Sequence, residues 1–179
     1  MFRKMVVCGI VESKLIMDQC TKAIGLVDPD LEVETLEKYH VERHHDIMTD
    51  TPGWLKPTME QFERILDFSK DFTPDDYVMF HCSAGIARST ATAIMVLMQH
   101  GATAKDAFQM VYDVRPHMNP NSLILTFADE LLEQNGSLLE YYKQWRHEKR
   151  VNPQAFAGQQ KDTGDAADIA VMKSFLLKL

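Results

Sequence analysis

The segment from residue 77 to residue 98 constrains the fold more than any other part of the sequence. Residues 77–81 form a short apolar run with the composition of a buried strand, and residues 89–98 have the composition of a helix. The loop between them consists of small residues, one isoleucine and one arginine. A turn from a strand into a helix directs backbone N–H groups and the positive end of the helix dipole into one concavity. The sequence therefore predicts an anion-binding loop at residues 82–88.

Cys82 and Arg88 are the two side chains of this loop that carry chemistry. The N–H groups and dipole that bind an anion also stabilise a thiolate, so Cys82 is expected to be a nucleophile. Arg88 returns to the same concavity when the loop curls, and its planar guanidinium can bind two phosphoryl oxygens. We therefore expect Arg88 to hold a phosphoryl group in line with the sulfur of Cys82.

The neighbouring residues fit a narrow phosphate-binding loop. Gly85 permits backbone torsions that a Cβ atom would resist, and Ser89 can hydrogen-bond the departing thiolate. His81 is expected to fix the loop through its ring without touching the substrate. We expect the phosphate to be bound by the residues that follow the cysteine, namely Ser83, Ala84, Gly85, Ile86, Ala87 and Arg88.

Apolar runs alternate with helical periodicity along the chain. This alternation predicts an α/β fold in which a mainly parallel central sheet is flanked by helices and the phosphate-binding loop joins a strand to a helix. The expected strands lie near residues 5–11, 23–27, 38–44 and 77–81, and the expected helices near 57–70, 88–100, 103–114, 121–134 and 137–149.

A chain of 179 residues suits one domain, which we expect at residues 1–150. The composition then shifts to Gln, Asp, Gly and Ala, which predicts a flexible linker from residue 151 to about 168. Residues 169–179 place apolar side chains at helical spacing, so a short amphipathic helix is expected to end the chain.

The bulk composition excludes several classes of protein. The net charge of -7 offers no basic surface for nucleic acid or anionic lipid. No apolar run is long enough for a membrane span, and the first strand lacks the cleavage site of a signal peptide. Three cysteines without a CxxC pair favour a reducing compartment, so we expect a cytoplasmic protein whose Cys8 and Cys20 are core thiols.

The segment HCSAGIARS at residues 81–89 resembles the HCxxGxxR(S/T) signature of the cysteine-based protein tyrosine phosphatases. The similarity covers about residues 1–148 and is greatest to the compact dual-specificity branch, bacterial or phage types included. It implies hydrolysis of phosphate monoesters through a phosphocysteine intermediate without a metal or other cofactor. It also implies that an upstream aspartate protonates the leaving group.

Two aspartates compete for that role. The resemblance favours Asp50 by its spacing from Cys82, and the Asp-Thr-Pro-Gly context of this residue is that of a mobile loop. Asp46 closes the strand predicted from Tyr39 to His45, where the acid of the family usually emerges, so we favour Asp46. Both residues remain candidates.

The substrate implied is a phosphorylated protein or a small phosphate monoester, with phosphotyrosine favoured and phosphoserine or phosphothreonine accepted by a shallow cleft. The alternatives are a lipid or RNA phosphatase, a phosphate-binding pseudophosphatase, and a sulfur carrier of the rhodanese type. Arg115 is expected to form a structural salt bridge near the phosphate loop, and Trp54 either faces substrate or packs in its loop. The adjacent His44 and His45 point to opposite faces of a strand, which disfavours a metal site. The sequence predicts no oligomeric state.

Overall fold

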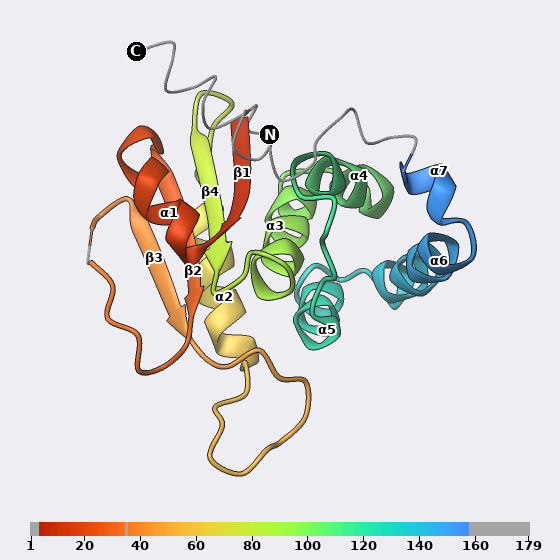
Figure 1. Cartoon of the computed structure of the whole chain (residues 1–179), viewed down its shortest axis with the longest axis horizontal. Helices are drawn as coiled ribbons and strands as arrows, with labels where there is room; N and C mark the ends of the chain where they lie inside the picture. Colours follow the sequence, from red (N-terminus) through yellow and green to blue (C-terminus); the bar gives the residue numbers. More distant parts are fainter. Residues whose placement is uncertain (1–3, 35, 158–179) are drawn as a thin grey trace. The chain divides into compact units, whose positions relative to one another are not determined.

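A computed structural model describes residues 4–34 and 36–157. Contacts divide the chain into two compact units, Met1–Tyr142 and Lys143–Leu179, and each is described by itself. The first unit contains one sheet of four parallel strands in the order β1-β4-β2-β3 (Figure 1). The strands are β1 (Lys4–Gly9), β2 (Lys22–Val27), β3 (Tyr39–Arg43) and β4 (Tyr77–Cys82).

The parallel sheet confirms the predicted fold class. The two central strands are buried almost throughout, which explains why their sequences are continuous apolar runs rather than alternating ones. Because all strands are parallel, their carboxyl ends meet at one edge of the sheet. The loops that follow β1, β2, β3 and β4 therefore converge at this edge.

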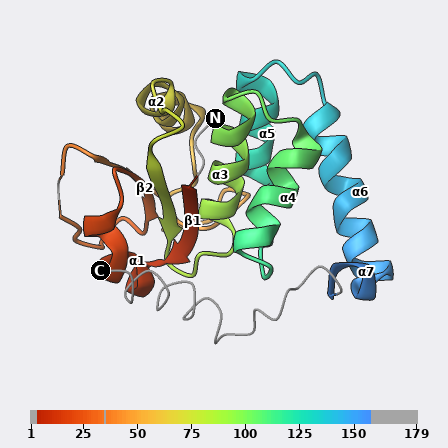
Figure 2. The ribbon, with the colours of Figure 1, turned by 90° about the horizontal axis from the view of Figure 1, so that it is seen from above.

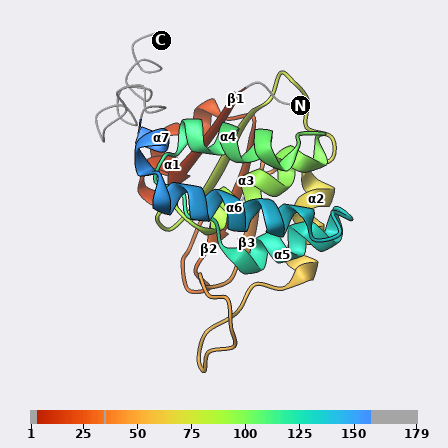
Figure 3. The same cartoon turned by 90° about the vertical axis from the view of Figure 1, so that its right-hand side faces the viewer.

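Helices cover the sheet on both sides. One face carries α3 (Arg88–Gln99), α4 (Ala104–Val114) and α5 (Ser122–Leu131), as Figures 1 and 3 show. The helix α2 (Met59–Ser69) contacts α3 and α5 on that side. The view from above shows the short α1 (Ile10–Ile16) across the sheet from these helices (Figure 2). A single 3-10 turn, η1 (Met17–Gln19), follows α1.

The first strand is shorter than the sequence predicted. The expected strand at residues 5–11 ends at Gly9, and α1 begins at Ile10. The backbone N–H of Gly9 donates to the carboxylate of Glu12, and the Ser13 hydroxyl donates to the carbonyl of Ile10. These local hydrogen bonds start a helix although Ile10 and Val11 continue the apolar run.

The predicted helix 121–134 also ends early. The chain leaves α5 after Leu131 because Glu133, Asn135 and Gly136 adopt positive φ angles of 53°, 52° and 87°. The carboxylate of Asp129 accepts from the N–H of Gly136 at 2.7 Å and from that of Leu138 at 3.0 Å. This carboxylate therefore holds the turn that leads into α6 (Ser137–Val151).

The second unit contains the end of α6 and the short α7 (Pro153–Ala157). Within it the rings of Trp145 and Phe156 meet edge to face at 6.0 Å, and the Lys149 ammonium lies 4.8 Å from the centre of the Trp145 ring. Helix α7 thus falls in the stretch from residue 151 for which the composition predicted a linker. The rest of that stretch and the expected helix 169–179 lie outside the described residues.

Within residues 4–34 and 36–157, no helix combines the length and apolar character needed to cross a membrane.

Candidate active site

Three loops at the carboxyl edge of the sheet bring the candidate site residues together. Cys82 ends β4, and Arg88 begins α3 after a loop of five residues. Asp28 follows β2 directly, and residues 44–46 follow β3. Parallel α/β sheets commonly bind ligands at such an edge, because helix N-termini and loops face it.

The backbone carbonyls of the loop point away from its centre. The carbonyl of Ser83 accepts from the N–H of Ile10 at 3.3 Å, and that of Ile86 accepts from Asn119 at 2.9 Å. The carbonyl of Ala87 accepts from the N–H of Asn121 at 3.2 Å. Together with the two carbonyls that bind Arg115, every carbonyl from residue 83 to residue 87 is bonded to another part of the chain.

The N–H groups of the loop are left for a ligand. Gly85 N–H donates to the Cys82 sulfur at 3.2 Å, whereas those of Ala84, Ile86 and Ala87 have no acceptor among the described residues. The N-cap residue of α3, Ala87, supplies no capping side chain, and the first turn of the helix holds no acidic residue. An uncapped helix start with free N–H groups binds anions.

Arg115 braces the loop from outside. Its Nε donates to the carbonyl of Gly85 at 3.1 Å and its Nη2 to that of Ala84 at 2.9 Å, while Nη1 lies 3.3 Å from a Glu12 carboxylate oxygen. This arrangement confirms the predicted structural salt bridge. Gly85 has a φ of 71°, and a Cβ atom there would lie 2.4 Å from the backbone carbon of Cys8, so only glycine fits.

The sulfur of Cys82 is in hydrogen-bonding reach of two groups. The hydroxyl oxygen of Ser89 lies 3.3 Å from the sulfur, and Gly85 N–H approaches from the loop. These groups stabilise a thiolate more than a neutral thiol. Cys82 is 2% exposed, so its thiolate would have little other solvation.

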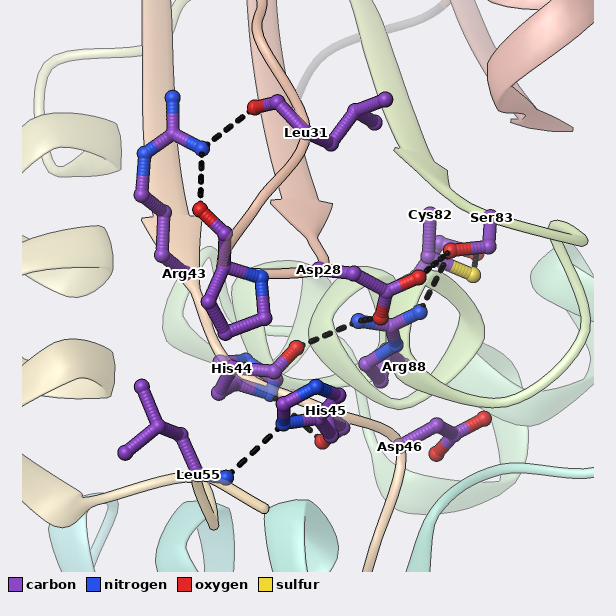
Figure 4. A network of polar contacts seen from close by, with 12 residues as sticks. Asp28, Leu31, Arg43, His44, His45, Asp46, Leu55, Cys82, Ser83 and Arg88 are labelled. Atoms are coloured by element: carbon purple, nitrogen blue, oxygen red, sulfur yellow. Dashed lines mark hydrogen bonds and ion pairs between the residues drawn. The ribbon is translucent and has the colours of Figure 1, made fainter. Parts of the chain in front are cut away.

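Arg88 is buried with part of its guanidinium unpaired. Its Nη1 donates to the carbonyl of His44 at 2.6 Å and pairs with Asp28 Oδ1 at 2.9 Å, and its Nη2 donates to the hydroxyl of Ser83 at 2.7 Å (Figure 4). Its Nε has no partner among the described residues. A buried guanidinium N–H without an acceptor is costly, which indicates that an oxygen of a ligand takes this position.

The two candidate acids lie in different surroundings. Asp46 accepts from the side-chain amide of Asn121 at 2.8 Å, and the N–H of the same Asn121 bonds Ala87 at the end of the phosphate loop. Asp50 is paired with Lys56 at 2.7 Å, and its side chain is 90% exposed. The structure thus ties Asp46, but not Asp50, to a residue that contacts the loop.

Two buried histidines flank Arg88 without touching the loop interior. The His81 ring nitrogen Nε2 lies 2.6 Å from the Tyr39 hydroxyl, and a Cβ at Gly25 would overlap both groups. The His44 ring packs on Phe62. Burial, reinforced by the charge of Arg88, lowers the pKa of both histidines to about 4, so both rings are neutral at pH 7. His81 thus bonds β3 rather than the loop itself.

The two other cysteines lie in the core, and Trp54 lies at the surface. Cys8 and Cys20 are free and buried as expected, and burial raises the pKa of the Cys20 thiol to about 11. The Trp54 ring lies 4.5 Å from that of His45 and stays 53% exposed, so this residue both packs in its loop and faces solvent. Among the residues that the structure describes, no three acidic, His or Cys side chains cluster as a metal would require.

Asp28 is the residue that sequence reasoning missed. Its two carboxylate oxygens contact Arg88 and Ser83 at the phosphate loop. It directly follows the strand expected at residues 23–27. A mainly parallel sheet was expected, which would put the carboxyl end of that strand at the same edge of the sheet as Cys82, and this signal could have identified Asp28.

Comparisons with known proteins agree with this geometry, although no family model matches the chain. The chain is 27% identical over 138 residues to the dual specificity protein phosphatase Mpk3 of Drosophila melanogaster, covering 64% of this chain and 34% of that protein. It is 42% identical over 62 residues to the human dual specificity protein phosphatase 8, covering 34% of this chain and 9% of that protein. The chain thus spans about a third or less of these relatives.

Solved structures share the fold at low identity. The Cydia pomonella PTP-2 phosphatase superposes with a TM-score of 0.55 at 18% identity, covering 72% of this chain and 85% of that one. Human DUSP28 superposes with a TM-score of 0.50 at 17% identity, covering 74% and 94%. In its loop and its curated relatives the chain resembles the cysteine-based protein tyrosine phosphatases, and in particular their compact dual-specificity branch, and its fold is that of the solved phosphatases.

Proposed function

We propose that this protein hydrolyses phosphate monoesters through a phosphocysteine intermediate, with Cys82 as nucleophile and Arg88 as phosphate ligand. The observation that carries the proposal is the Nε of the buried Arg88, which has no partner among the described residues, beside the N–H groups of Ala84, Ile86 and Ala87, which have no acceptor there either. These donors match the oxygens of a phosphoryl group, and the Cys82 sulfur lies at the start of the same loop.

The reaction follows from these positions. The thiolate of Cys82 attacks phosphorus, so an S–P bond forms while the P–O bond to the leaving group breaks. The N–H groups and Arg88 stabilise the charge on the equatorial oxygens. Asp46 in its acid form gives a proton to the leaving oxygen. In the second step Asp46 accepts a proton from water, water attacks phosphorus, and the departing thiolate is hydrogen-bonded by Ser89.

We propose phosphotyrosine in proteins as the favoured substrate, with phosphoserine and phosphothreonine as weaker ones. The support is that Ile86 of the loop is 37% exposed, and that Trp54 and Leu55, which contact His45 after β3, are each more than half exposed. An aromatic ring gains more than a short aliphatic stem from such contacts. The absence of any lysine in residues 82–88 disfavours polyanionic lipid or RNA substrates.

A substrate panel tests the proposal. The parent and Cys82→Ser are assayed with a phosphotyrosine peptide, the matched phosphoserine and phosphothreonine peptides, a phosphoinositide in detergent micelles, and thiosulfate with cyanide. We expect turnover of the phosphotyrosine peptide by the parent and none by the variant, which should still bind inorganic phosphate. Sulfur transfer from thiosulfate without phosphate release, or full activity of Cys82→Ser, would contradict the proposal.

A further inference from the structure

We infer that the side chain of His45 positions the proposed acid, Asp46, by closing the loop that carries it. This loop, residues 45–55, is called the acid loop below and leaves the end of β3. The inference rests on the proposed function and adds to it a residue outside the phosphate loop. The structure shows the two ends of the acid loop joined through His45, directly beside the carboxylate that would deliver the proton.

Two hydrogen bonds join the ends of the acid loop. The N–H of His45 donates to the carbonyl of Leu55 at 2.8 Å, and the N–H of Leu55 donates to Nδ1 of the His45 ring at 2.8 Å. Figure 4 shows the ring of His45 turned towards Leu55, while Asp46 extends to the other side. An accepting ring nitrogen needs a free lone pair, so the hydrogen of this ring lies on Nε2 and not on Nδ1.

The backbone on the other side of His45 is fixed to the phosphate site. The carbonyl of His45 accepts from Nδ1 of the buried His44 at 3.1 Å, and the carbonyl of His44 accepts from Nη1 of Arg88 at 2.6 Å. The backbone that leads into Asp46 is therefore held to the phosphate-binding guanidinium. The ring of His45 extends this hold to Leu55, where the acid loop returns.

Burial contributes little to the conformation of the acid loop. All residues from 48 to 55 are exposed, so packing against the core does not fix them. The carboxylate of Asp46 accepts from the side-chain amide of Asn121 at 2.8 Å, and this contact lies on the outgoing side of the loop. The returning side is joined to β3 by the bonds between His45 and Leu55. A loop with so few buried contacts opens readily unless its hydrogen bonds close it.

Two substitutions separate the ring nitrogen of His45 from the packing of its ring. The ring also lies 4.5 Å from that of Trp54, so both roles have to be tested. His45→Phe keeps a ring and loses the acceptor, whereas His45→Asn loses the ring and places its side-chain oxygen where Nδ1 lies. Thr51→Val is the matched control, because it removes the hydrogen bond from the Thr51 hydroxyl to the carbonyl of Thr49 at 3.2 Å within the same loop.

The experiment measures kcat and KM with aryl phosphates whose leaving groups range from good to poor. A displaced acid matters most for a poor leaving group, because such a group needs the proton. His45→Phe should lower kcat about tenfold for the poorest leaving group and less than about twofold for the best, with KM unchanged. His45→Asn and Thr51→Val should both stay within about twofold of the parent. In the Asp46→Asn background, His45→Phe should cause no further loss, since the acid on which it acts is gone.

Three results would overturn the inference. They are an equal loss for all leaving groups in His45→Phe, an equal loss in His45→Asn, which would make ring packing the cause, and a further loss in the Asp46→Asn background. If the parent hydrolyses no phosphate monoester, the proposed function fails, and the NMR signal of the Asn121 side-chain amide reports the position of Asp46 instead. His45→Phe should then move this signal towards its position in Asp46→Ala, and His45→Asn should leave it in place. An unmoved signal in His45→Phe would overturn the inference.

Discussion

Asp46 and Asp50 lie four positions apart on one loop, and their surroundings differ in what they offer catalysis. Asp46 is held by the amide of Asn121, which is also the N-cap of α5 and bonds the phosphate loop through its backbone. Asp50 is solvated and paired with Lys56 at the surface. A group that must deliver a proton to a bound substrate benefits from a fixed position near it, which favours Asp46.

Paired substitutions test this assignment. Asp46→Asn should lower kcat by about a hundredfold or more, and the loss should be largest for leaving groups that need protonation. Its rate should no longer fall at alkaline pH, because no acid remains to be deprotonated. Asp50→Asn is the matched control and should retain both the rate and the shape of the profile. A reversed pattern in the pH profiles of kcat would assign the acid to Asp50.

The element on which the site depends is the loop between β4 and α3. Its carbonyls are fixed by Ile10, Arg115, Asn119 and Asn121, which come from three other parts of the chain. Among the described residues, the N–H groups of Ala84, Ile86 and Ala87 have no acceptor, so they remain available to a ligand. The backbone at Gly85 completes this shape with a conformation that other residues rarely adopt.

Gly85→Ala should therefore distort the loop. A positive φ costs any non-glycine residue about 1–2 kcal/mol. Gly101 also has a positive φ, of 90°, but a Cβ there meets nothing within 4 Å, so Gly101→Ala should lose only that amount. At Gly85 the overlap with Cys8 adds about 1–3 kcal/mol. Chemical denaturation of both variants measures the difference, and equal stability with retained activity would show that the loop tolerates a side chain.

Elements with strong patterns were predicted well from sequence, and those set by distant partners were not. The strand β4 and the helix α3 were predicted because both are buried along most of their length, and buried elements have long apolar runs in their sequences. Helix α1 was not predicted, since its start depends on the Glu12 carboxylate rather than on apolar spacing. The loop residues were found by their spacing. The contacts of Asp28 with Arg88 and Ser83 depend on the pairing of β2 with β4. This pairing cannot be predicted from the residues next to Asp28.

At the scale of the whole molecule, stability should depend on pH, because His44 and His81 are buried and neutral in the part of the chain that the structure describes. In the unfolded chain each would bind a proton below pH 6.5, whereas burial lowers the folded pKa of His44 and His81 to about 4. Between pH 6.5 and about pH 4, the unfolded state therefore binds more protons than the folded state. The free energy of unfolding is greatest above pH 6.5 and falls as the pH drops towards 4, by about 3 kcal/mol for each histidine.

Urea denaturation across this pH range measures the effect. His81→Gln should be less stable at neutral pH but show a shallower dependence on pH, because one of the two titrating groups is gone. Protonation of Glu42, whose pKa is lowered chiefly by hydrogen bonds from His40 and Arg64 against the opposing effect of burial, adds a further loss below its ordinary value of 4.5. A free energy of unfolding that stays constant from pH 6.5 to pH 5 would contradict the account of both histidines.

The covalent intermediate tests the central claim most directly. The parent is mixed with an aryl phosphate, quenched in acid within the first turnovers, digested, and examined by mass spectrometry. We predict one added phosphoryl group on the peptide that contains Cys82, more of it in Ser89→Ala because the thiolate leaves less readily, and none in Cys82→Ser. Hydrolysis without phosphate on Cys82, or phosphate on another residue, would contradict the account.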